Sequence, residues 1–122
     1  MAHYMLLIYG QQGPWESLGE DERNAVYERY QALSNDLRAQ DKLISANELQ
    51  PTSTATTVRV RDGETEITDG PFAETKEVLG GYYLIEADSL DEALDWAGRI
   101  PSVETGSVEV RPCVMRPAEV AR

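Results

Sequence analysis

Two carboxylates and an amine stand close together in one short polar segment of the chain, residues 69–76, which reads DGPFAETK. The charged side chains are those of Asp69, Glu74 and Lys76. Proline fixes its own backbone φ angle and the glycine before it frees the backbone, so the segment predicts a turn of restricted shape. A carboxylate presented from such a turn can act as a general base, and the neighbouring charges can form the rim of a polar ligand site.

The aspartate of this segment has two interpretations. An aspartate before glycine and proline either hydrogen-bonds its own turn or faces a cleft as a general base. We favour the structural turn, and Asp69 is the candidate catalytic residue if the turn faces a cleft. Glu74 and Lys76 either form a solvated surface, in which Lys76 pairs with a nearby acid, or belong to a ligand rim with Asp69.

Aromatic and acidic side chains elsewhere supply further candidates for ligand binding. Phe72, the only phenylalanine, either anchors the segment in the core, which we favour, or lines a pocket. Tyr9, Trp15 and Glu48 are secondary candidates, because the ends of the first two predicted strands and the loop over residues 10–17 should lie near one mouth of the sheet. Ordinary packing is the favoured alternative for these three residues.

The sequence lacks the motifs of several common cofactor sites. Gly80 and Gly81 precede a predicted strand instead of opening a helix, so they indicate close backbone packing or a bulge rather than a phosphate loop. One histidine, His3, and one cysteine, Cys113, cannot supply a conventional nitrogen and sulfur metal site or an intrachain disulfide. A carboxylate site such as Glu48 with Asp69 is the alternative that remains for a metal. We predict no cofactor and no metal.

Length and charge limit the partners that the protein can have. The 122 residues carry a formal net charge of -11 at pH 7, and this length predicts one domain over residues 1–122. The negative charge repels phosphate backbones and anionic lipid heads, so direct nucleic-acid binding is not expected. No apolar run approaches the ~18 residues of a membrane-spanning helix, and the amino terminus lacks a secretory signal. A cytoplasmic protein without membrane contact is expected.

Hydrophobic periodicity predicts alternating strands and helices. Serine and glutamate pairs with capping-box spacing, at residues 17–20 and 89–92, predict the starts of two helices, with a loop over residues 10–14 before the first. The apolar stripes expected on these helices are Val26, Tyr30, Leu33 and Leu37, and Leu90, Ala93, Leu94 and Ala97. The strands are predicted over residues 4–9, 42–49, 56–61, 65–68, 81–87 and 107–114.

These elements follow the order of a common α+β plan. Asp62 and Gly63 between two alternating runs predict a β-hairpin, inserted at about residues 53–68. Without the insert the order is that of a ferredoxin-like βαββαβ sheet with both helices on one face. The other face needs a cover, and the pairing of two sheets is the simplest one, so we expect a homodimer.

Four segments of the chain resemble one protein family. They are residues 4–9, 53–58, 69–76 and 106–112, which are similar to the DGPF group of the YCII-related proteins. The resemblance covers almost the whole chain and implies a dimeric α+β barrel without an established activity. Members of the wider family have a proposed histidine and aspartate pair in a cleft between helix and sheet. Tyr30 falls at the place of that histidine, so the resemblance implies the fold and the turn but not a mechanism.

Two hypotheses about function belong to different classes. The first is a small-molecule-binding or enzymatic barrel with a cleft between sheet and helix, in which Asp69 with Lys76 or Glu48 transfers a proton. The second is a non-catalytic regulatory or protein-interaction module. The resemblance links this module to sigma-factor-dependent transcription, because DGPF proteins are often encoded near extracytoplasmic-function sigma factors or resemble segments joined to them. A stable dimer whose pocket is filled by side chains is a third alternative.

Overall fold

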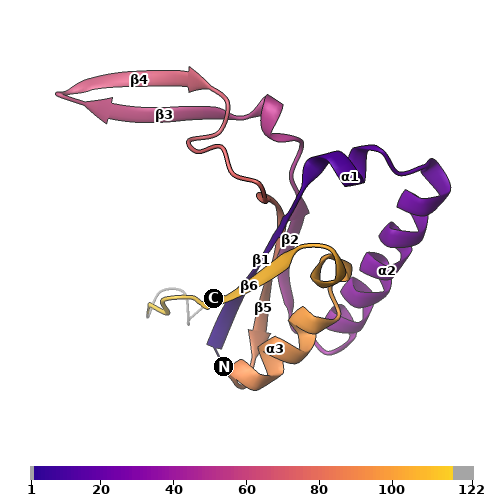
Figure 1. Ribbon diagram of the computed structural model, residues 1–122. Helices are drawn as coiled ribbons and strands as arrows, with labels where there is room; N and C mark the ends of the chain where they lie inside the picture. The colour runs from indigo at the N-terminus through magenta and orange to yellow at the C-terminus, as the bar shows by residue number, and fades with distance from the viewer. Residues whose placement is uncertain (1, 117–122) are drawn as a thin grey trace.

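The computed structural model describes residues 2–116, in which one antiparallel sheet carries helices on one face and a separate hairpin extends from one end (Figure 1). The strand order in the sheet is β2-β5-β1-β6, which is the ferredoxin-like order. This confirms the predicted α+β fold class. The strands are β1 (Ala2–Gly10), β2 (Leu43–Glu48), β5 (Val78–Ala87) and β6 (Ser107–Pro112). The helices are α1 (Gln12–Glu16), α2 (Glu20–Ala39) and α3 (Leu90–Gly98), with short 3-10 turns η1 (Thr52–Thr54) and η2 (Pro101–Glu104).

The core lies between the sheet and the helices, because alternate residues of the central strands point toward α2 and α3. In β1 these are Tyr4 and Leu6, and in β5 they are Tyr83 and Ile85, all of them buried. The helices and the turn after α3 contribute the other large members of this core cluster, Leu33, Leu37, Trp96 and Ile100. Of the stripe predicted for α2, Leu33 and Leu37 are buried, whereas Val26 and Tyr30 are half-buried.

The stripe predicted for α3 is partly wrong. Ala93 and Ala97 are buried as expected, but Leu90 and Leu94 are each 47% exposed. The face that packs on the sheet instead runs through Trp96. Both stripes contain the two alanines and both satisfy helical spacing. Burial of the large indole ring of Trp96 removes more apolar surface from water than burial of a leucine side chain does, so the helix packs with Trp96 toward the sheet.

The start of the first long helix also differs from the prediction. A short helix, α1, occupies part of the predicted loop, and the hydroxyl of Ser17 donates to the carbonyl oxygens of Gly13 at 3.0 Å and Pro14 at 3.1 Å. Ser17 therefore ends α1, and α2 begins at Glu20 with Gly19 as a cap that has no side chain. A serine hydroxyl can bond backward or forward along the chain, and here the backward partners are the closer ones.

The second capping box is confirmed for its serine, while its glutamate bonds to the residue before the N-cap. The Ser89 hydroxyl accepts from the backbone N–H of Glu92 at 3.1 Å, while the Glu92 carboxylate accepts from the backbone N–H of Asp88 at 2.8 Å. The same carboxylate accepts from the indole N–H of Trp96 at 3.2 Å and lies 2.8 Å from the Lys42 ammonium. Glu92 thereby joins the start of α3 to the start of β2.

Replacing Glu92 by glutamine is expected to lower the free energy of unfolding at pH 7 by about 1–2 kcal/mol, a value discounted for partial solvent screening. The N–H of Asp88, then Lys42 and Trp96, lower the pKa of Glu92 from 4.5 to about 2. A lowered pKa stabilises the fold above pH 4.5, and this contribution is lost as the pH falls toward 2. Urea titrations from pH 7 to pH 2.5 measure it. The exposed Glu28 supplies the matched control, Glu28→Gln, and equal stability of the two variants at every pH would contradict the prediction.

The glycine pair at 80 and 81 has both predicted roles. The pairing of β1 with β5 passes from Ile8–Gly81 to Tyr9–Leu79, so Gly80 is the extra residue of a bulge. A Cβ atom on Gly81 would lie 2.8 Å from the carbonyl oxygen of Asn47 in β2, which is the predicted close backbone approach. No helix within residues 2–116 is both long and apolar enough to cross a membrane.

The predicted hairpin consists of β3 (Thr56–Arg61) and β4 (Glu64–Asp69), which form a two-stranded sheet of their own. Asp62 and Gly63 turn the chain with φ angles of 52° and 79°, the left-handed conformation expected for this dipeptide. The hairpin extends away from the main sheet, on the side opposite to α2 (Figure 1). We call it the arm.

The second face of the main sheet, opposite the core, is mainly apolar along its centre. Strand alternation places five half-buried side chains there, which are Met5, Leu7, Tyr9, Tyr82 and Leu84. Polar groups flank them: His3 Nε2 lies 3.2 Å from Glu86 Oε1. At the β6 edge of the same face, Arg111 Nε donates to the Glu109 carboxylate at 2.7 Å. We call this surface the open face.

Candidate functional site

Segment 69–76 borders a groove of about 550 Å³ between the base of the arm and α1. The loop after β1 and segment 69–76 therefore meet at one end of the sheet. The groove is lined by Gln12, Glu16, Pro51, Thr52, Ser53, Gly70, Pro71, Ala73, Glu74, Thr75 and Val78.

Hydrogen bonds to the backbone hold the walls of this groove in place. Gly70 has a φ angle of 98°, and its N–H donates to the carbonyl oxygen of Ala55 at 2.7 Å. The hydroxyl of Thr57 donates to the carbonyl oxygen of Gly70 at 2.8 Å. Across the groove, the backbone N–H of Thr52 donates to the side-chain oxygen of Gln12 at 2.7 Å. The turn is thus tied to β3, and η1 is tied to α1.

The lining residues favour a ligand that donates hydrogen bonds or carries a positive charge. Glu16 and Glu74 supply carboxylates, and no lysine or arginine is among the lining residues. The hydroxyls of Thr52 and Ser53 add further polar atoms, while prolines, Ala73 and Val78 form apolar wall. Carboxylates bind cationic donors through charge-assisted hydrogen bonds, which are about twice as strong as neutral ones.

Asp69 is the last residue of β4, and it directly precedes the groove-lining Gly70. Its carboxylate makes no hydrogen bond with the part of the chain that the structure describes, so the favoured interpretation, a side chain bonded to its own turn, is wrong. The bonds of Thr57 and of the Gly70 N–H hold the turn instead. The alternative, proton transfer by Asp69, stays a prediction.

Phe72 does not anchor segment 69–76 in the core, because its side chain is 78% exposed. The turn is held by the two hydrogen bonds at Gly70 and needs no buried ring, so that interpretation is also wrong. Lys76 is exposed and forms no ion pair with any acid between residues 2 and 116, contrary to the predicted surface pair. Of the charged candidates in this segment, Glu74 is the one that lines the groove.

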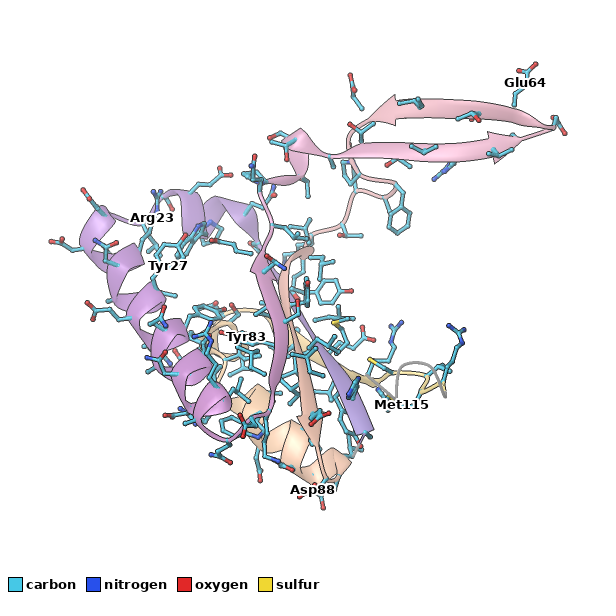
Figure 2. The ribbon with its side chains drawn as sticks, turned by 180° about the vertical axis from the view of Figure 1, so that it is seen from behind. Arg23, Tyr27, Glu64, Tyr83, Asp88 and Met115 are labelled. Atoms are coloured by element: carbon cyan, nitrogen blue, oxygen red, sulfur yellow. The ribbon has the colours of Figure 1, made fainter. Side chains whose placement is uncertain are left out.

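Trp15 and Glu48 are brought together by a residue that sequence reasoning missed, Tyr27. The Tyr27 ring meets the Trp15 ring edge to face at 5.4 Å, and its hydroxyl donates to the Glu48 carboxylate at 3.1 Å. Arg23 Nε donates to the backbone carbonyl oxygen of Trp15 at 3.3 Å, and Arg23 Nη2 donates to the backbone carbonyl oxygen of Glu16 at 2.5 Å. Figure 2 shows Arg23 and Tyr27 on the side of α2 that faces the sheet. We call Trp15, Arg23, Tyr27 and Glu48 the Tyr27 cluster.

The phenol of Tyr27 is neutral at physiological pH. Burial, followed by the charge of Glu48, raises the pKa of Tyr27 above its ordinary value of 10.0. Tyr27 can therefore donate a hydrogen bond but does not act as a base near pH 7. A sequence signal for this residue exists, because Arg23, Tyr27 and Tyr30 follow at i+4 and i+3 spacing and so share one side of a helix.

Tyr30 stands on α2 and packs against the sheet. Its Oη lies 2.6 Å from Ser102 Oγ, and its ring stacks on that of Tyr83 with centroids 6.4 Å apart. Burial raises the pKa of Tyr30, so this group also stays neutral. His3 lies on the open face beside Glu86, on the far side of the sheet. A histidine and aspartate pair is therefore not formed at Tyr30.

The third secondary candidate, Tyr9, does not join the groove or the Tyr27 cluster. It pairs with Leu79 and Ser107 on the open face of the sheet. The residues of α1 and η1 that line the groove were not predicted, because neither element carries a periodic signal of its own. No group of three or more histidine, cysteine or acidic side chains in the described chain is placed to hold a metal ion.

The chain is similar to known proteins over nearly its whole length. The model of the YCII-related domain matches residues 2–115. The chain is also 40% identical over 120 residues to an uncharacterized protein of Rhizobium meliloti (strain 1021). The aligned region covers 96% of this chain and 97% of that protein. A match of this extent includes β1, the groove, the arm and β6. The protein with this ferredoxin-like sheet and inserted arm therefore belongs to the family of YCII-related proteins.

Proposed function

We propose that this protein binds a small molecule bearing a cationic or hydrogen-bond-donating group, and that segment 69–76 forms one wall of the site. The observation that carries the proposal is the groove, whose volume of about 550 Å³ falls within the ~300–1,000 Å³ typical of small-molecule sites. Glu16 and Glu74 would bind the donor group of the ligand. Arg23 connects the groove to the Tyr27 cluster through its bond to the Glu16 backbone.

We also propose that the protein is a homodimer paired through the open face. Five half-buried apolar side chains with a polar rim match the composition of a protein interface. The total exposed surface supports pairing as well. The chain exposes 8469 Å², whereas a compact monomer of 13.6 kDa exposes about 6,600 Å².

The excess surface, roughly 1,900 Å², is larger than one half of a stable interface. A standard interface buries about 800 Å² on each partner. The exposed area in excess of a compact monomer is therefore large enough to form one half of a dimer interface.

Native mass spectrometry of protein isolated gently from its own cells tests the ligand proposal. We expect a stoichiometric small-molecule adduct on the dimer. The double variant Glu16→Gln with Glu74→Gln is expected to bind this molecule about a hundredfold more weakly, because two charge-assisted hydrogen bonds are lost. Glu28→Gln with Asp91→Asn, two exposed acids away from the groove, keeps the same net charge as the double variant and should retain the adduct.

Two outcomes would contradict the ligand proposal. One is equal retention of the adduct by both double variants. The other is adduct-free protein that also fails to bind a panel of primary amines at millimolar concentration. Once a ligand is known, Asp69→Asn tests proton transfer: unchanged binding and turnover would remove Asp69 from the site. The dimer mass is read from the same spectrum, so pairing and ligand binding are scored separately.

A further inference from the structure

The arm carries an exposed apolar face. Val58 and Val60 lie two residues apart on β3 and so point to the same side, and Ile67 is directly opposite Val58 on β4. Their side chains are 61%, 68% and 69% exposed. Three β-branched apolar residues on one side of a hairpin are typical of a surface that packs against another one.

The arm has little support from its own chain. No residue of β3 or β4 is buried, and the arm forms a sheet separate from the main one. A two-stranded hairpin is marginally stable in water by itself, and it becomes stable when its apolar face packs against another element. A partner surface for the side that carries Val58, Val60 and Ile67 would supply that packing.

The position of the arm indicates which surface it meets. The arm leaves the end of the sheet on the side opposite to α2 (Figure 1), and the open face lies on the side of the sheet away from the core. A second copy stacked on the open face would therefore sit beside the arm. In a two-fold dimer the same contact is made twice, so each arm would pack against the other copy.

We propose that the arm packs on the body of a second copy of this chain through Val58, Val60 and Ile67, an inference that rests on the pairing proposed above. We assign a second copy as the occupant because the arm stands beside the face on which that copy would be stacked (Figure 1). The excess surface is also large enough for the roughly 800 Å² that each partner of a standard interface buries. The arm gives this dimer a contact that the sheet alone does not provide.

The triple variant Val58→Thr, Val60→Thr and Ile67→Thr tests the contact, because threonine keeps the β-branched shape and removes apolar surface. We expect the dimer dissociation constant, measured by sedimentation, to rise at least about tenfold. The matched control changes the opposite side of the arm, with Arg59→Thr, Arg61→Thr and Glu66→Thr, and should stay within about twofold of wild type.

Amide hydrogen exchange on the unmodified dimer provides a second measurement that does not depend on how the triple variant folds. We expect slow exchange at the amides of β3 and β4 that pair within the arm, and fast exchange of the same amides in a monomeric Leu84→Asp variant. A dimer with unchanged affinity in the triple variant, or with fast exchange in the arm, would overturn the arm contact and leave the pairing intact. Slow exchange that persists in the monomer would show that the arm is stable without a second copy and would overturn the arm contact, and a wild-type monomer would overturn both proposals.

Discussion

A Leu84→Asp variant is expected to sediment as a monomer at concentrations where the unmodified protein is a dimer. Leu84 lies at the centre of the open face, between Met5 on β1 and Ser45 on β2. Two-fold pairing would bury one new carboxylate from each copy in this apolar centre. Burying an unpaired charge costs several kcal/mol, so we expect the dissociation constant to rise at least about a thousandfold.

The matched control for this variant is Leu94→Asp. Leu94 is 47% exposed on α3 and lies outside the open face, so the new charge should leave the dimer unchanged. Both variants should remain folded, because neither substitution changes the core side of β5. Circular dichroism of each variant checks this. A folded Leu84→Asp protein that stays dimeric would show that the open face is not the paired surface.

Gly106→Ala is expected to lower the free energy of unfolding by about 3 kcal/mol or more, or to prevent folding. A Cβ atom at this position would lie 2.2 Å from the carbonyl oxygen of Tyr9 and 3.0 Å from the Cα of Gly10. Both atoms belong to the backbone at the end of β1, where hydrogen-bonded strands resist displacement. Relief of the contact must therefore separate β1 from the start of β6. Urea denaturation of the two proteins measures the difference.

Gly98→Ala is the control for this substitution. Nothing lies within 4 Å of a Cβ atom placed on Gly98 at the end of α3. Alanine has the higher helix propensity, so we expect this variant to be unchanged or more stable by up to about 1 kcal/mol. Equal denaturation midpoints for the two alanine variants would mean that the backbone at Tyr9 yields without cost.

Much of the fold could be predicted because its signals are local. The turn at Asp62 and Gly63 depends on two residues that adopt positive φ angles. The capping box from Ser89 to Glu92 closes within one helical turn. The short apolar runs that predicted β1 and β5 are likewise contained within each strand.

Predictions that required a choice between equally good local patterns were less successful. Ser17 satisfies a capping box by spacing but bonds backward to Gly13 and Pro14. Helical spacing on α3 allows both the Leu90 and the Trp96 stripe, and packing selected the second. The same limit applies to the candidate site, because no local pattern indicates that Tyr27 lies between Trp15 and Glu48.

The sequence by itself determined the α+β class, the order of the strands and helices, the arm with its turn, and the family through its extended motifs. Only the tertiary structure decided that Glu74 lines a groove with Glu16, that Phe72 points to solvent, and that Tyr9 lies on the open face. The physical reason is the separation along the chain of the residues that interact. Backbone angles and caps depend on neighbours a few residues away, whereas the residues that share a groove or a face are selected by the summed packing of segments far apart in the chain.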